Sequence, residues 1–522
     1  MKWLCAAAAA VLTLQAAGCA ITIPAPERAL LFGRNKDAVS LDPAIATDGL
    51  SFNIARVTMQ GLTHYHLGGF APEPQLATSW TSSADGRSWL FTLRHGVTFQ
   101  DGTPFDAAAV KYNFDRWMKD DPHFSYFHSQ FGSYPSVIKD VSVVAPDRVR
   151  IDLRSPIATF VADLAMPAFS ISSPTALRTL GQDYAKQPSG TGPYEVAEWV
   201  KDDHITLKAW PGYWGKHPSI NTVIIRDIPD PATAVLELQK GDLDGLEFPR
   251  PDDLPALLAD PKLHVYRQPP NNLMYLSMND QMKPFDDVLV RRAINEAIDT
   301  RAIVKNFYDS SAIVATEFVP PAVWPHGVRT SYAYDPADAR RLLAQAGYPH
   351  GFSAPLWYMT LPRPYVPEPQ RVAEAIQSDL QAIGITTTLS GLEWGTYLVK
   401  VGSGEHHLAL MGWTGDDGDP DNFLYPLLDK DSAIPPNANN TAFWIDAPFH
   451  RLMLAGRSTL NRAARETIYR AALARVSEQA PVVAIVHTSP PIVFGADIRG
   501  YVPSPDSGLH FETMYFAGGA HD

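Results

Sequence analysis

Apolar residues recur along the chain with two periods, one typical of helices and one typical of strands. Helical spacing over 337–346 and over 370–383, each followed by a glycine, predicts two helices. A third helix is expected from Asp106 to Trp117, with Asp106 as its N-cap residue. Short runs rich in β-branched and aromatic residues predict strands at 89–93, 97–99, 141–144, 149–153, 385–389 and 407–412.

This mixture of helices and strands predicts an α/β protein. Open sheets of this class bind ligands where strand ends face a crevice. The chain has 522 residues, of which 45% are hydrophobic, and this is more than a single core accommodates. We therefore expect two or more domains, although no internal repeat or long linker separates them in the sequence.

The first residues are typical of an export signal. Lys2 precedes the apolar run Leu4–Leu14, which is too short to span a bilayer and is followed by small residues. We expect residues 1–18 to be a cleaved signal peptide. The segment AAGC at 16–19 resembles a bacterial lipobox, in which Cys19 carries the lipid anchor. The alternative is ordinary cleavage at a small-residue site, which leaves a soluble periplasmic protein.

The charge balance and the two cysteines limit the partners and the covalent bonds of the mature chain. The net charge is −13 at pH 7, so nucleic acid and anionic membrane surfaces are poor partners. Cleavage after Gly18 removes Cys5 and leaves only Cys19, so no disulfide forms within the mature chain. Its stability must then come from the burial of apolar residues.

The sequence lacks the short motifs of the common catalytic sites. It contains no nucleophile elbow, no H-E-x-x-H helix, no P-loop and no dinucleotide-binding glycine turn. His406 and His407 are adjacent, so in a strand they point to opposite faces and cannot share a metal. The acidic run 416–422 does not fit an EF-hand loop, because its glycine at the sixth place puts Trp413 at the first ligand position. We expect no enzyme, no cofactor and no bound metal.

Several short motifs occur in one order along the chain, and together they carry a resemblance. They are SLDPA (40–44), LATSW (76–80), LRHGVTFQDGTPF (93–105), GTGPY (190–194), YW (213–214), PFDD (284–287), VRRA (290–293) and AID (297–299). This ordered set resembles the dipeptide and oligopeptide substrate-binding proteins of bacterial ABC importers, over essentially the whole mature chain.

The resemblance implies a two-lobed α/β fold of the periplasmic-binding-protein type (class II) with an extra inserted subdomain. The expected first lobe is discontinuous, and the expected parts are 27–60, 175–270 and 495–522 for lobe I, 61–174 for the subdomain and 271–494 for lobe II. It also implies a monomer at the periplasmic face of the cell membrane, in contact with the membrane through the lipid anchor only. Its expected partners are a short peptide ligand and the permease subunits of an importer.

The segment 411–423 is similar to the dipeptide-binding branch of this family. The resemblance implies that Asp416 binds the α-ammonium group of the peptide and that Arg363 binds its α-carboxylate. Tyr365, Trp413 and Gly415 complete the expected set of ligand-binding residues. Tyr365 lines the pocket or belongs to the core, and Trp413 packs at the lobe interface.

The physical chemistry of a free peptide agrees with such a pair of charges. A dipeptide is a zwitterion, and enclosing it requires a partner for each charged end, because an unpaired buried charge is costly. Two extended residues span roughly 7 Å, so a fixed arginine–aspartate separation would select peptide length. Alternative interpretations remain for both residues: Asp416 is a turn residue, and Arg363 is a solvated residue before a helix. For the whole protein, the alternatives are binding of another solute (glutathione, haem or an antimicrobial peptide) and a role as a ligand-presenting sensor.

Overall fold

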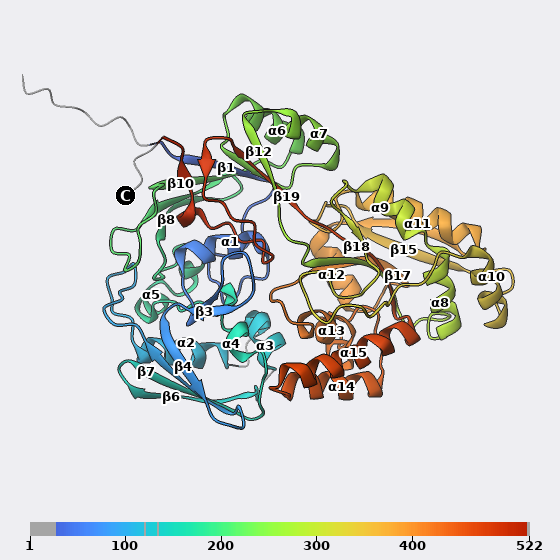
Figure 1. Cartoon of the computed structure of the whole chain (residues 1–522), viewed down its shortest axis with the longest axis horizontal. Helices are drawn as coiled ribbons and strands as arrows, with labels where there is room; N and C mark the ends of the chain where they lie inside the picture. Colours follow the sequence, from blue (N-terminus) through green and yellow to red (C-terminus); the bar gives the residue numbers. More distant parts are fainter. Residues whose placement is uncertain (1–27, 120–121, 133–134, 519–522) are drawn as a thin grey trace, which may run out of the picture.

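The computed structural model describes residues 28–119, 122–132 and 135–518, which form two lobes side by side (Figure 1). The expected signal peptide at 1–18 and the expected lipidation site at Cys19 lie outside the described residues. Within the described ranges, no helix combines the length and the apolar character needed to cross a membrane.

The first lobe is built on a seven-stranded sheet with the strand order β12-β19-β11-β1-β10-β9-β8. Alternate residues of β1 face opposite cores: Phe32 packs with α1, and Leu31 packs with α6 and α7. The elements are β1 (Leu30–Arg34), α1 (Gly49–Thr58), β8 (Tyr194–Val200), β9 (His204–Ala209), β10 (Thr222–Asp227), α6 (Pro231–Lys240), β11 (Gly245–Glu247), α7 (Leu254–Ala259), β12 (Leu263–Arg267), β19 (Pro491–Gly495), β20 (Ile498–Arg499) and β21 (Tyr515–Phe516).

The segment between α1 and β8 forms a separate four-stranded antiparallel sheet with its own aromatic core. Its strand order is β4-β5-β7-β6, and α2 packs on β6 and β7. The elements are β2 (Thr63–Tyr65), β3 (Pro72–Pro74), β4 (Ala77–Ser82), β5 (Ser88–Leu93), α2 (Ala107–Trp117), α3 (Ser125–Phe131), β6 (Ile138–Ala145), β7 (Arg148–Leu153), α4 (Phe160–Asp163) and α5 (Pro174–Leu180).

The second lobe contains a six-stranded sheet with the order β14-β18-β13-β17-β15-β16 and the largest hydrophobic core. Strands β16, β15 and β17 are neighbours and run parallel. The elements are β13 (Asn272–Met278), α8 (Val288–Ala297), α9 (Thr300–Phe307), β14 (Ile313–Val314), α10 (Pro336–Gln345), β15 (Ser353–Met359), α11 (Pro369–Ala382), β16 (Thr386–Leu392), α12 (Trp394–Gly402), β17 (Leu408–Thr414), α13 (Asp421–Leu428), α14 (Ala447–Ser458), α15 (Arg462–Gln479) and β18 (Val482–His487).

Most of the elements expected from periodicity are confirmed. The N-cap of α2 is Asp106, whose carboxylate accepts a hydrogen bond from the Ala109 amide at 2.9 Å. Helices α10 and α11 are each followed by a glycine with positive φ, a conformation that glycine adopts without strain. The strand expected at 97–99 is wrong: only an isolated bridge between Thr98 and Pro104 forms there.

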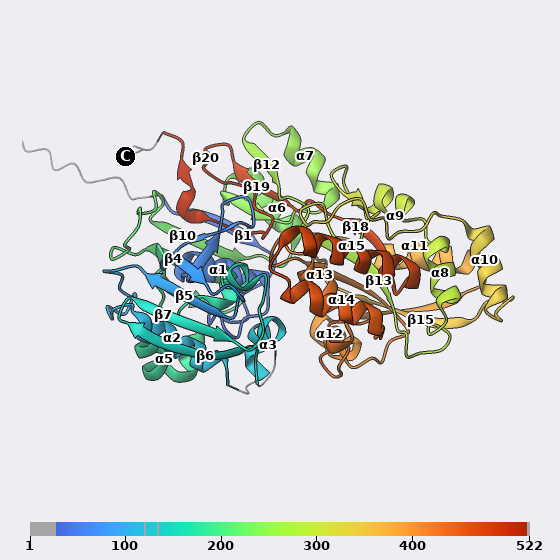
Figure 2. The same cartoon turned by 60° about the horizontal axis from the view of Figure 1, so that its bottom comes forward.

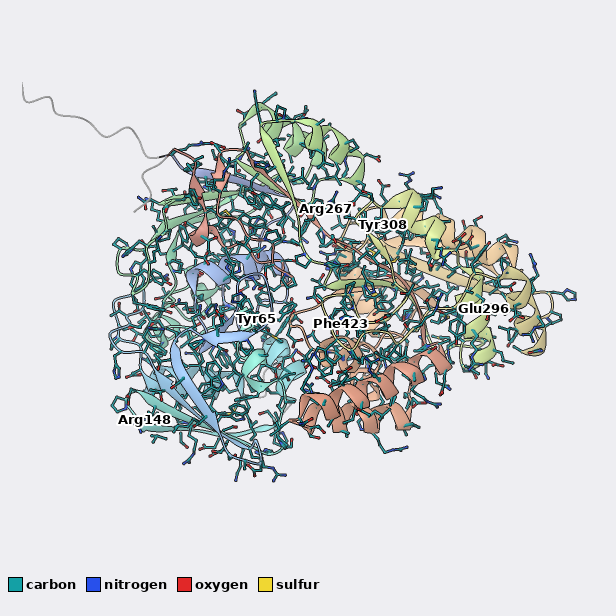
Figure 3. All side chains as sticks on the ribbon, in the orientation of Figure 1. Tyr65, Arg148, Arg267, Glu296, Tyr308 and Phe423 are labelled. Carbon is teal, nitrogen blue, oxygen red and sulfur yellow. The ribbon has the colours of Figure 1, made fainter. Side chains whose placement is uncertain are left out.

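The chain passes between the lobes twice, from β12 to β13 and from β18 to β19. Figure 3 shows Arg267 and Tyr308 at this junction, where the guanidinium of Arg267 bonds the carboxylate of Asp309 at 2.8 Å. Because β19 pairs with β11 and β12, the first-lobe sheet includes residues 491–494, which precede the expected start at 495.

Candidate ligand-binding cavity

A cavity of about 890 Å³ lies between the two lobes. Its walls come from α1 and β11 of the first lobe, from α3 of the inserted segment, and from loops and helices of the second lobe. Figures 1 and 2 show α3 on the side of the first lobe that faces the second lobe. The five residues expected to contact ligand all line this cavity: Arg363, Tyr365, Trp413, Gly415 and Asp416.

Sheet topology explains why residues far apart in the sequence meet here. Strands β15 and β17 are parallel neighbours, so their carboxyl ends lie at one edge of the sheet. Arg363 follows the end of β15, and Asp416 follows the end of β17. Two groups of opposite charge therefore line the same cavity from the same sheet edge.

Arg363 is held in a tight loop and presents its guanidinium to the cavity. Backbone hydrogen bonds of 3.0 and 2.9 Å join Arg363 and Val366. The guanidinium lies 3.7 Å from the centre of the Trp394 ring, a cation–π contact. Burial lowers the pKa of Arg363. Its buried Nε–H donates no hydrogen bond to any of the described residues.

Asp416 is held by partners from both lobes. One carboxylate oxygen accepts a hydrogen bond of 2.6 Å from the Tyr126 hydroxyl of α3, and the other accepts one of 3.3 Å from the Asn422 amide. The Asp416 backbone amide also donates to the Asn422 side chain at 2.9 Å. Burial raises the pKa of Asp416, while these hydrogen bonds and the nearby Arg56 oppose that shift.

Tyr365 satisfies both interpretations that the sequence left open, because it is buried and also lines the cavity. Its ring packs on Gly412, where an added Cβ would lie 2.3 Å from the ring. Tyr365 is also held through its carbonyl oxygen, which accepts a hydrogen bond of 3.1 Å from Tyr308. The strand glycine therefore positions the tyrosine ring.

Trp413 and Gly415 fix the backbone around Asp416. The Trp413 indole donates to Asn422 at 3.1 Å, and Asn422 in turn holds Asp416. The Gly415 amide donates to the Asn271 carbonyl at 2.7 Å, and an added Cβ would lie 2.6 Å from the Phe423 ring. Figure 3 shows Phe423 in the second lobe on the side facing Tyr65 of the first.

A comparison with protein families shows the family to which this chain belongs. The family model described as bacterial extracellular solute-binding proteins, family 5 Middle, matches residues 71–434. The chain belongs to this family.

Relatives of this solute-binding protein agree with that assignment. The dipeptide-binding protein of Escherichia coli (strain K12) is 33% identical over 95% of this chain and 96% of its own length. The heme-binding protein A of Haemophilus influenzae is 33% identical over 90% of this chain and 89% of its own length. These matches confirm the resemblance seen in the sequence motifs, and the family is one of solute-binding proteins rather than enzymes.

A solved structure confirms the two-lobed fold of the solute-binding protein. The ABC transporter-associated periplasmic binding protein DppA from Helicobacter pylori, in complex with peptide STSA, has a TM-score of 0.85 and 32% sequence identity. The match covers 94% of this chain and 98% of that chain. The α/β class and the periplasmic-binding-protein architecture therefore hold for the whole described molecule.

Among the cavity residues of the solute-binding protein that sequence patterns missed are Tyr126, Trp394 and Asn422. Asn422 lies in the segment that predicted Asp416, but a hydrogen bond to a neighbouring loop leaves no periodic signal. Trp394 begins the helix that follows β16, and its contact with Arg363 depends on the packing of the lobe. Tyr126 reaches Asp416 only because the lobes meet.

Proposed function

We propose that this solute-binding protein captures short peptides, dipeptides foremost, between its lobes and delivers them to the permease subunits of an ABC importer. Support comes from the dipeptide-binding relative and from the peptide-bound, transporter-associated structural neighbour. The observation that carries the proposal is the pair of opposite charges, Arg363 and Asp416, in one cavity.

The two charges suit the two ends of a free peptide. The planar guanidinium of Arg363, fixed against Trp394, suits a carboxylate in two parallel hydrogen bonds. Asp416 would accept hydrogen bonds from the α-ammonium group, whose charge would also compensate the buried carboxylate. A ligand that supplies both charges leaves neither protein group unpaired.

The cavity leaves room for peptide side chains of different size. Its volume of about 890 Å³ is typical of small-molecule sites, and much of its lining is apolar or aromatic. Selection would then rest on the charged ends of the peptide, with looser requirements on the side chains.

Closure of the lobes would complete the ligand's contacts and present the loaded protein to the permease. The hydrogen bond between Tyr126 and Asp416 already joins the two sides of the cavity. We also propose that the protein is a periplasmic monomer anchored through Cys19. The family supports the extracytoplasmic location.

The alternative is another solute, such as haem, and the heme-binding relative favours it. Haem carries carboxylates but no ammonium group, so it would satisfy Arg363 and leave Asp416 without a new partner. Glutathione offers both kinds of charge and would compete with dipeptides for the same pair. A sensory role would use the same cavity with a receptor in place of the permease.

Calorimetric titration with blocked peptides tests the proposal. The mature chain without residues 1–19, freed of co-purified ligand, is titrated with Ala-Leu, N-acetyl-Ala-Leu and Ala-Leu-amide, and separately with haem and glutathione. Micromolar or tighter binding of free Ala-Leu, lost when either end is blocked, is the expected result. Binding of haem or glutathione with no binding of any free dipeptide would overturn the dipeptide assignment.

A further inference from the structure

The first lobe brings several charged residues to the cavity, Arg34 and Glu247 among them. Strands β1 and β11 are parallel neighbours, and their last residues are Arg34 and Glu247. Gly245 packs against Phe32, and Arg34 and Glu247 each lie two positions further along, so they share that face of the sheet. Both residues line the cavity. The carboxyl ends of β1 and β11 therefore line the cavity from the first lobe, opposite Arg363 and Asp416 of the second lobe.

Arg34 is already shared between carboxylates at this edge of the sheet. Arg34 already bonds two buried carboxylates, those of Asp37 at 2.8 Å and Asp227 at 2.6 Å. Lys201 adds one more cation, 2.9 Å from Asp37. Glu247 is a third carboxylate near Arg34.

One oxygen of Glu247 is buried without a hydrogen-bond partner within the described part of the chain. The residue is 5% exposed, and its Oε2 accepts no hydrogen bond there. Burial raises the pKa of Glu247 to about 7, and the nearby Arg34 only partly opposes this. A cation that comes close to such a buried carboxylate stabilises its charged form.

The backbone after Glu247 directs the chain along the cavity wall. Phe248 has a φ of +51°, in the left-handed region that a bulky residue seldom adopts. Its amide donates to the Pro491 carbonyl at 3.2 Å, and the residue lines the cavity. The turn ends β11 at Glu247, so that this carboxylate stands at the cavity edge of the sheet.

We propose that the Glu247 end of the cavity is a subsite for a cationic side chain of the ligand, an amine or a guanidinium. This inference rests on the proposed peptide-binding function and adds a side-chain preference to it. The charged ends of the peptide remain with Arg363 and Asp416, and a lysine or arginine side chain reaches across to the first lobe. Pairing gives Glu247 a cation, whereas Arg34 already bonds Asp37 and Asp227.

The test compares lysine with norleucine, whose side chain has the same four carbons without the ammonium group. Lys-Ala, Ala-Lys, Nle-Ala and Ala-Nle are titrated into the wild-type protein, Glu247→Gln and Glu237→Gln. Glu237 is the matched control, because it lies on α6, pairs with Arg226 at 2.6 Å and does not line the cavity. At least one lysine peptide should bind the wild type about tenfold more tightly than its norleucine partner.

Glu247→Gln should remove that preference and leave the norleucine affinities within about twofold, whereas Glu237→Gln should keep it. Equal binding of lysine and norleucine peptides by the wild type would overturn the subsite while leaving the peptide-binding function standing. This comparison needs no variant, so it can overturn the subsite even if Glu247→Gln does not fold. A lysine preference that persists in folded Glu247→Gln would also overturn the assignment, and failure of all four peptides to bind would overturn the function itself.

Discussion

Arg363 and Asp416 of the second lobe differ in how many of their hydrogen-bonding atoms have partners in the protein. Arg363 stacks on Trp394, and its Nε has no hydrogen-bond partner among the residues that the structure describes. Asp416 accepts hydrogen bonds from Tyr126 and Asn422. In the proposed complex, Arg363 therefore gains the larger number of new hydrogen bonds, and Asp416 contributes mainly the charge that matches the ammonium group.

Replacing Arg363 by lysine keeps the charge but removes the planar group. Arg363→Lys should weaken dipeptide binding by about tenfold or more, because lysine can neither form two parallel hydrogen bonds to the peptide carboxylate nor stack on Trp394 as the guanidinium does. Arg371→Lys is the control, since Arg371 lies over Phe307 and pairs with Glu368 outside the cavity. Calorimetry on both variants checks this, and equal affinity for the two would contradict the role of Arg363.

Asp163 makes stability depend on pH. Burial raises its pKa from 3.8 to about 7, and its Oδ1 has no hydrogen-bond partner in the described part of the chain. Between about pH 4 and pH 7 the unfolded chain loses this proton while the folded protein keeps it, so stability falls as pH rises through this range. Above pH 7 the folded state holds a buried charge whose desolvation Thr159 and Arg457 only partly offset.

Asp163→Asn should therefore be more stable than the wild type at pH 8, by on the order of 2 kcal/mol, with the difference shrinking toward pH 4. The Thr159 hydroxyl, which donates to Asp163 at 2.9 Å, still has an acceptor in the amide oxygen. Thermal unfolding at pH 4.5, 6 and 8 measures the difference. A variant that is less stable than the wild type at pH 8 would contradict this prediction.

At the scale of elements, the ends of parallel strands determine where the chemistry lies. β15 and β17 bring Arg363 and Asp416 to one cavity, and β1 and β11 bring Arg34 and Glu247 to the same cavity from the other lobe. The sheets themselves contribute rigid positions, and the loops after the strands contribute the functional groups.

Much of this arrangement could be predicted from local sequence. Two sequence features predict the helix at 107–117, an N-cap aspartate and an apolar face, and the structure has a helix at these residues. The expected strand 97–99 failed because Val97 and Phe99 are buried within a turn, where the Phe99 amide bonds the Thr103 carbonyl at 2.7 Å. Apolar alternation over three residues does not distinguish such a turn from a strand.

The candidate site could be predicted only in part. Arg363, Tyr365, Trp413, Gly415 and Asp416 came from a resemblance in two continuous segments, and the structure brings all five to one cavity. Tyr126 could not be found in this way, because its link to Asp416 crosses 290 residues of sequence. Glu247 is a single acidic residue in a short strand, and only its burial without a partner distinguishes it.

Gly412 tests how strand β17 positions the ligand site. Gly412→Ala places a Cβ 2.3 Å from the Tyr365 ring, so the ring must move into the cavity or the strand must shift. We expect dipeptide affinity to fall by about tenfold and stability to fall by about 1–3 kcal/mol, as for other overpacked sites. Calorimetry and thermal unfolding measure the two effects, and an affinity equal to that of the wild type would show that the Tyr365 ring does not border the ligand.

At the scale of the whole molecule, the lobes touch beyond the two chain crossings. The Tyr126 hydroxyl bonds Asp416, and the Arg457 guanidinium of α14 bonds the Gln130 carbonyl of α3 at 2.9 Å. Phe70 of the inserted segment packs on Gly418 of the acidic loop. These contacts lie around the cavity, so lobe closure and ligand capture involve the same surfaces.

Removing one of these contacts should favour an open molecule. Tyr126→Phe deletes the hydrogen bond to Asp416, and bonds to charged groups contribute about 1.5–3 kcal/mol. We expect a larger radius of gyration for the ligand-free variant than for the ligand-free wild type in small-angle X-ray scattering, and recovery of the compact form with saturating dipeptide. Equal radii without ligand would show that this bond does not help to close the lobes.

The central claim is that Arg363 binds the carboxylate end and Asp416 the ammonium end of a peptide. The most direct measurement is the affinity of the wild type, Arg363→Gln and Asp416→Asn for Ala-Leu with free, acetylated or amidated ends. Amidation should weaken binding to the wild type by about a hundredfold and leave binding to Arg363→Gln almost unchanged. Acetylation should likewise weaken binding to the wild type and leave binding to Asp416→Asn almost unchanged. If each blocked end weakens binding as much in its matched variant as in the wild type, the two residues do not hold the peptide ends.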